Sequence, residues 1–95
     1  MALATQPFDP ADYLGSPEAR AAYLEDAFAS NDAAEITEAL GVVARAAGMS
    51  GLAAETGLKR EALYRSLSAK GNPGLRTILE VMKALGLQLA PVQVK

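Results

Sequence analysis

The segment from residue 50 to 68 constrains the fold of this chain more than any other part of its sequence. It contains two short stretches with helical spacing of leucine and alanine, and Gly57 separates them. Helices this short are marginal by themselves, so the pair needs further helices to cover its apolar side. We expect Gly57 to adopt the positive φ of a tight turn and the small Ala53 to let the two helices cross closely. Four leucines are expected to face the scaffold: Leu52, Leu58, Leu63 and Leu67.

The rest of the sequence predicts the helices of that scaffold. Ser16 stands before a proline and an acid, which is typical of a helix start, and Asp32 with Glu35 resembles a capping box. Ser50 is expected to cap the first helix of the two-helix unit. Gly41 inside a helix predicts that a neighbouring helix passes close to it. The five expected helices span residues 17–29, 32–47, 51–56, 59–69 and 75–85.

Two predictions concern how the outer segments pack. Residues 8–14 are expected to form a turn or short helical segment anchored by Phe8, Tyr13 and Leu14. The last helix is expected to turn one apolar face inward. That face consists of Leu75, Ile78, Leu79, Met82 and Leu85.

Composition supports one all-α domain. Half of the 95 residues are apolar, with alanine and leucine dominant, and only five are aromatic. We expect residues 1–7 to be a flexible tail and residues 8–95 to be a single domain. The sequence has no cysteine, no signal-like N-terminus and no apolar run long enough to span a bilayer, which predicts a cytoplasmic protein without membrane contact.

Charge is distributed very unevenly along the chain. Residues 1–44 contain eight acids against Arg20 alone, which gives −7, while residues 45–95 contain eight bases against three acids, which gives +5. The formal net charge is therefore −2, yet only the second half is suited to binding a polyanion.

The basic half places polar side chains on the outside of the second short helix. If Leu63 and Leu67 face inward, the opposite face is polar and basic, and its arginines can fork onto guanine or grip phosphates. Ser50 could bond a phosphate from the first helix, and the loop after the second helix would skim the far strand. The candidate DNA-binding residues are Ser50, Lys59, Arg60, Glu61, Tyr64, Arg65, Ser68, Lys70 and Asn72. For each residue the alternative is a solvated surface position.

The C-terminal tail alternates apolar and polar residues in a way typical of a short strand. A lone strand has no partner within a helical domain, so we hypothesise that it pairs with its own copy across a two-fold axis. The apolar residues of this predicted dimer contact are Leu87, Leu89, Val92 and Val94.

Several ordered motifs resemble a known family. They include Phe8-Asp-Pro-Ala-Asp-Tyr-Leu14, Glu55-Thr-Gly-Leu58, Arg60-Glu-Ala-Leu-Tyr64, Gly71-Asn-Pro73 and Ala84-Leu-Gly-Leu87. Together they resemble the addiction-module antidote proteins, which are HigA-like relatives of the Xre/Cro helix-turn-helix repressors. The resemblance implies a lambda-repressor-like domain that binds operator DNA as a homodimer, represses its own operon and neutralises a RelE-like toxin.

The sequence bears on four other possibilities: an enzyme, a metal site, a toxin-binding module and a stand-alone repressor. An enzyme has little support because the chain lacks His and Cys and shows no catalytic spacing, so we expect no catalytic residues and no cofactor. Asp9, Asp12 and Glu18 could form a hard-metal site, but acids at helix starts are ordinarily caps. A toxin-binding module with little DNA binding, and a stand-alone phage-type repressor, both remain open.

Overall fold

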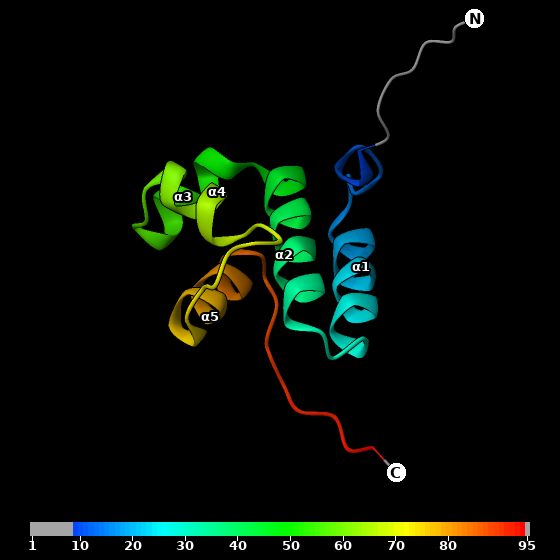
Figure 1. The fold of residues 1–95 in the computed structure, drawn as a ribbon. Coiled ribbons are helices and arrows are strands. Elements are labelled where there is room, and N and C mark those ends of the chain that lie inside the picture. The colour runs from blue at the N-terminus through cyan, green and yellow to red at the C-terminus, as the bar shows by residue number, and fades with distance from the viewer. Residues whose placement is uncertain (1–8, 95) are drawn as a thin grey trace, which may run out of the picture.

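The computed structural model describes residues 9–94, and this part of the chain contains six helical segments (Figure 1). The first is a short 3₁₀ helix, η1, and the other five are α-helices. They are η1 (Pro10–Tyr13), α1 (Pro17–Ala29), α2 (Ala33–Ala47), α3 (Met49–Thr56), α4 (Arg60–Ser66) and α5 (Leu75–Ala84). The predicted all-α fold with five helices is therefore confirmed. None of these helices combines the length and the apolar character needed to cross a membrane.

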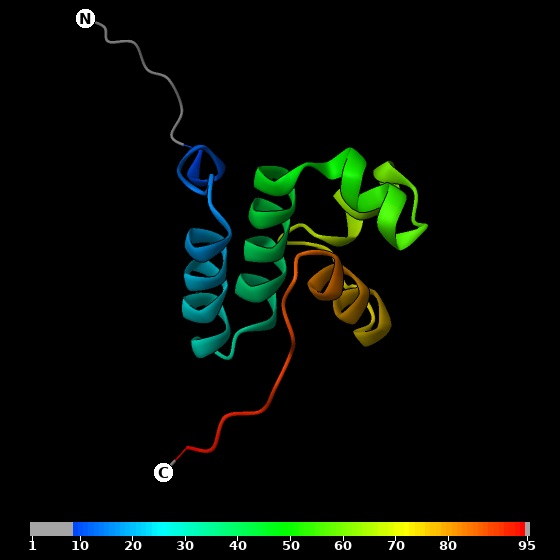
Figure 2. The ribbon, with the colours of Figure 1, turned by 180° about the vertical axis from the view of Figure 1, so that it is seen from behind.

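Helix α2 lies at the centre of the arrangement. It runs beside α1 on one side, while α3, α4 and α5 lie on its other side in both views (Figures 1 and 2). Leu40, Val43 and Ala44 of α2 are completely buried. Because α2 contributes more buried residues than any other described helix, it is the common support of the two flanks.

The helix starts of the first half follow the prediction in most respects. The Ser16 side chain accepts from the Ala19 N–H at 3.1 Å, and Asp32 accepts from the Ala34 N–H at 3.0 Å. The predicted reciprocal bond of a capping box is replaced: the Asp32 N–H donates to the Ser30 hydroxyl at 3.1 Å, because Ser30 ends α1 only two residues earlier. Gly48 ends α2 with a φ of 112°, as expected for a glycine at that position.

Two boundaries of the two-helix unit differ from the prediction. Helix α3 begins at Met49, so Gly48 is its cap residue and Ser50 is an exposed residue of the first turn. Helix α4 ends at Ser66 instead of continuing to residue 69. Leu67 leaves the helical conformation with a ψ of 58°, its side chain is buried, and its carbonyl lies against α2 at Gly41.

The inner face of α5 is rotated relative to the prediction. Val81 and Met82 are buried at 0% and 5% exposure, whereas Leu75 and Leu79 are 63% and 45% exposed. Leu75 begins the helix directly after a loop, beyond the edge of the scaffold that covers Val81. The helix therefore carries an apolar pair on its outer side as well as an apolar core face.

The terminal segments correct two further predictions. Tyr13 is 69% exposed and is not a core anchor, whereas Leu14 is buried; Phe8 lies outside the described residues. The predicted strand is wrong for the isolated chain, because residues 87–94 are irregular and the described part contains no strand that could pair with them.

Gly41 allows the backbone at the end of α4 to lie very close to α2. A Cβ placed at this glycine would clash with the Leu67 carbonyl oxygen at the end of α4. The sequence prediction of a close neighbour at Gly41 is therefore confirmed, although the neighbour is the backbone just after a helix and not the helix itself.

We expect Gly41→Ala to destabilise the protein by about 1–3 kcal/mol, because a backbone carbonyl cannot move aside as a flexible side chain can. Gly51→Ala is the matched control: Gly51 also lies within a helix, but a Cβ there would meet open space. This control should gain about 0.5–1 kcal/mol from helix propensity. Urea unfolding of both variants measures the difference, and equal effects at the two sites would refute the close approach.

The ion pair between η1 and α2 gives a pH-dependent prediction. The Asp9 carboxylate accepts from the Ala11 N–H at 3.1 Å and from Arg45 Nη2 at 3.0 Å. These bonds hold the pKa of Asp9 below its ordinary value of 3.8, the first by hydrogen bonding and the second by both hydrogen bonding and charge. A lowered pKa in the folded state means that the stabilisation is present above pH 3.8 and is lost as the pH falls through the lowered value.

We therefore expect Asp9→Asn to lower Tm near neutral pH and to approach the wild-type Tm in acid. Asp12→Asn removes the same charge from a carboxylate that makes neither bond within the described residues. Thermal unfolding followed by circular dichroism between about pH 7 and pH 2 measures both. If the Tm difference between Asp9→Asn and wild type does not become smaller in acid, the ionised Asp9 carboxylate is not the source of the stabilisation.

Candidate nucleic-acid interface and acidic groove

The turn between α3 and α4 fixes how α4 is presented. Gly57 adopts a left-handed conformation with a φ of 74°, as predicted. The Thr56 hydroxyl donates to the Leu52 carbonyl at 2.8 Å and accepts from the Leu58 N–H at 3.3 Å, so one side chain bonds on both sides of the turn. Leu52 and Leu63 are 3% and 1% exposed and join the two helices to the core. The opposite side of α4 consequently points away from the scaffold.

The exposed side of α4 brings together five of the predicted DNA-binding residues. They are Lys59, Arg60, Glu61, Tyr64 and Arg65, and all are exposed. The Arg60 guanidinium lies 5.6 Å from the centre of the Tyr64 ring, within the range of a cation–π contact. Arg65 makes no side-chain ion pair or hydrogen bond within the described residues. We define these five residues as the α4 face, which carries three positive charges and one negative charge.

The other four predicted residues lie around the α4 face in different environments. Ser68 is half-buried, and its hydroxyl donates to the Arg65 carbonyl at 3.1 Å. This bond commits the hydroxyl to the end of the helix. Lys70 and Asn72 are exposed in the loop before α5, and Ser50 is exposed on α3.

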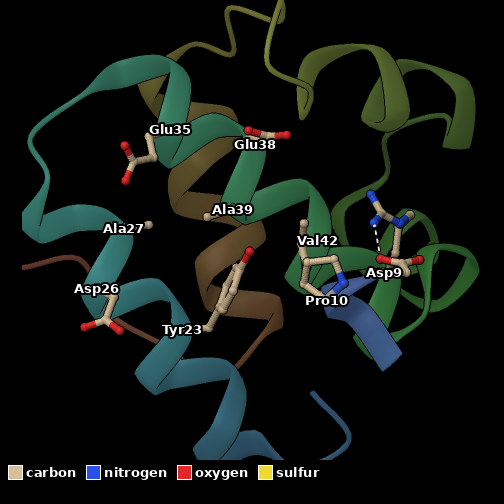
Figure 3. Close-up of a pocket in the computed structure, with 10 residues that line it drawn as sticks. Asp9, Pro10, Tyr23, Asp26, Ala27, Glu35, Glu38, Ala39 and Val42 are labelled. Atoms are coloured by element: carbon tan, nitrogen blue, oxygen red, sulfur yellow. Dashed lines mark hydrogen bonds and ion pairs between the residues drawn. The ribbon is translucent and has the colours of Figure 1, made fainter. Parts of the chain in front are cut away.

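A second feature, which the sequence prediction did not include, is a groove of about 500 Å³ between α1, α2 and η1 (Figure 3). Its apolar lining comes from both long helices: Ala27 of α1 and Ala39 and Val42 of α2 are buried at 5–7% exposure. The Tyr23 ring, half-buried, reaches from α1 across the groove toward α2. We call this the α1–α2 groove.

Carboxylates surround the α1–α2 groove. Asp26 stands on the α1 wall and Glu35 and Glu38 on the α2 wall, while the Asp9–Arg45 ion pair closes one end (Figure 3). Four acids against one arginine leave −3 on the lining. Although the sequence shows the excess of acids, it does not show that acids from two helices face one space, because this depends on how α1 pairs with α2.

The acidic residues do not form a metal site. Within residues 9–94, no group of three or more acidic side chains is placed to hold an ion, and the set Asp9, Asp12 and Glu18 is not brought together as one. Asp9 is instead committed to Arg45 and to the start of η1.

Comparison with known proteins gives one family and one relative. Residues 4–93 match the family model described as "Probable addiction module antidote protein". The chain is 44% identical over 81 residues to an "uncharacterized protein" of Haemophilus influenzae, an overlap that covers 85% of this chain and 84% of that protein. No solved structure matches significantly. Since the family model spans nearly the whole sequence, the chain belongs to the addiction-module antidote family.

Proposed function

We propose that this antidote binds operator DNA as a homodimer through the α4 face, represses its own operon and neutralises a RelE-like toxin. The observation that carries the DNA-binding part is the α4 face, which a glycine turn holds away from the core with three bases exposed. Family membership carries the toxin-binding part, because an antidote implies a cognate toxin.

The size and chemistry of α4 support insertion into the major groove. An α-helix with its side chains is about 10–12 Å across, which matches the major groove width of about 12 Å. Arg65 is the better candidate for forking onto a guanine, because its guanidinium has no partner within the described residues. Arg60 rests on Tyr64 and is better suited to a phosphate, where a cation held over a ring keeps its charge available.

The homodimer remains a proposal that the tail supports in part. Leu87 and Leu89 pack against the core of their own chain, whereas Val92 and Val94 are 82% and 83% exposed. Paired tails from two copies would cover these valines and satisfy the free backbone groups. Only the last part of the predicted contact is therefore available to a second copy.

Two alternatives from the sequence differ in observable ways. A toxin-binding module with little DNA binding would bind the toxin but show no salt-dependent binding of the α4 face to DNA. A stand-alone repressor would use the α4 face and have no toxin partner. The family favours the antidote over the stand-alone repressor.

The DNA proposal predicts that binding to a fragment of the antidote's own promoter weakens steeply as salt rises. For each phosphate contact, the logarithm of the binding constant should fall by about 0.9 per tenfold increase in salt concentration. Arg65→Ala should cost about 1–3 kcal/mol of binding energy. Lys83→Ala, which removes an exposed base from α5 outside the predicted set, is the matched control and should bind nearly as well as wild type. Fluorescence anisotropy measures both. Salt-independent binding with an unaffected Arg65→Ala variant would leave the toxin-binding module as the better proposal.

The dimer proposal predicts that deleting residues 91–95 lowers the apparent mass in size-exclusion chromatography with light scattering. This deletion removes the exposed valines but keeps Leu87, whose N–H donates to the Met82 carbonyl at 2.8 Å, and Leu89, which packs on the core. A truncated chain that stays dimeric would place the interface elsewhere. Leu75→Ser with Leu79→Ser then tests the other exposed apolar pair.

A further inference from the structure

We propose that the α1–α2 groove is the docking site for a basic segment of the cognate toxin, whose lysine or arginine side chain enters between α1 and α2. This inference rests on the proposed neutralisation of a toxin and adds the surface and the chemistry of the contact. It concerns a part of the molecule separate from the α4 face, because α2 lies between the two (Figures 1 and 2).

The lining of the groove matches the two parts of such a side chain. Lysine and arginine combine an apolar stem with a charged end, and they are bound best where apolar surface leads to a carboxylate. Ala27, Ala39 and Val42 supply the apolar surface, and all three are buried within the fold while lining the groove. The carboxylates of Asp26, Glu35 and Glu38 stand around it at the exposed margin.

The positions of the carboxylates favour an incoming cation over an internal partner. Glu35 and Glu38 are three residues apart and share one face of α2, while Asp26 stands on the α1 side of the groove with its carboxylate directed outward (Figure 3). None of the three makes an ion pair within residues 9–94. Arg45, the groove's own base, is already bonded to Asp9 at 3.0 Å. The net −3 of the lining is therefore left for a partner to neutralise.

Tyr23 adds a contact that a plain acidic surface lacks. Its half-buried ring lies in the groove beside the apolar lining, where a basic side chain entering the groove would meet it (Figure 3). Cation–π contacts of this kind favour lysine and arginine over neutral side chains. The groove therefore combines apolar surface for the stem, a ring and three carboxylates without an ion pair within the described residues. This combination selects a basic side chain more specifically than negative charge alone would.

A basic partner also relieves a cost built into this half of the protein. Eight acids against one arginine in residues 1–44 repel one another in the isolated chain. A toxin segment that carries positive charge would remove part of that repulsion when it docks. Charge complementarity of this type increases the association rate and excludes partners of the wrong sign.

The test uses the full-length antidote and the purified toxin encoded by the reading frame adjacent to its gene. Glu35→Gln with Glu38→Gln neutralises the α2 wall while preserving side-chain size. Glu18→Gln with Glu25→Gln is the matched control, because it removes the same charge from exposed residues of α1 that do not line the groove. Biolayer interferometry measures toxin affinity, and promoter-fragment anisotropy measures DNA affinity.

We expect the groove variant to weaken toxin binding by at least about 10-fold, mostly through slower association, and the control variant by about 3-fold or less. Tyr23→Leu, which keeps an apolar side chain but removes the ring, should also weaken toxin binding, with circular dichroism confirming its fold. DNA affinity should fall in none of these variants.

Each contrary outcome has its own meaning. If wild type binds the toxin and the groove and control variants lose equal affinity, the groove proposal is overturned while toxin neutralisation stands. If wild type does not bind the toxin at all, toxin neutralisation is overturned and the groove proposal with it. If the groove variant loses toxin and DNA affinity together, the effect is a general one on the fold and the docking site is rejected.

Discussion

The contact between Gly41 and the backbone at Leu67 is the constraint on which the rest of the structure depends. Only a residue without a Cβ lets the chain after α4 lie directly on α2. That contact sets how deeply Leu67 is buried and where α4 ends. The orientation of α4 is thus fixed at both ends: at its start by the Gly57 turn, and at its end by the close approach of the Leu67 backbone to Gly41.

Helix α2 links the two candidate interfaces without bringing them together. One side of it forms a wall of the α1–α2 groove, and the other side contacts α3, on which α4 and α5 pack (Figure 1). Glu35 and Glu38 stand near its start, whereas Gly41 lies at its middle. Because the groove lies on one flank of α2 and the α4 face on the other, the proposed toxin and DNA contacts involve different residues.

The sequence predicts local features well where a residue type has one dominant reason to be present. Gly57 in the turn and the caps Ser16 and Asp32 all occur as expected, because each satisfies a local backbone requirement. Gly41 could be predicted as a close approach, although the identity of its neighbour could not, since that depends on the path of a distant segment.

Predictions that depend on how distant segments pack together were more often wrong. Leu75 and Leu79 have the right spacing for an inner face, yet the scaffold does not extend over them. Ser50 has the right chemistry for a cap, but the helix begins two residues earlier than predicted, at Met49, with Gly48 as its cap. The α1–α2 groove could not be found from spacing at all, because Asp26 and Glu38 line the same space only when the two helices pair.

The separation of the acidic groove from the basic α4 face gives the molecule a permanent electric dipole. The sequence contains no histidine or cysteine, so this dipole keeps its size over the whole range in which carboxylates are ionised and lysines protonated. In the field of a polyanion, such a molecule is turned with its basic end forward before any contact forms. Ionic strength therefore modulates its orientation far more than pH does across the neutral range, and a toxin bound at the acidic end would face away from the duplex.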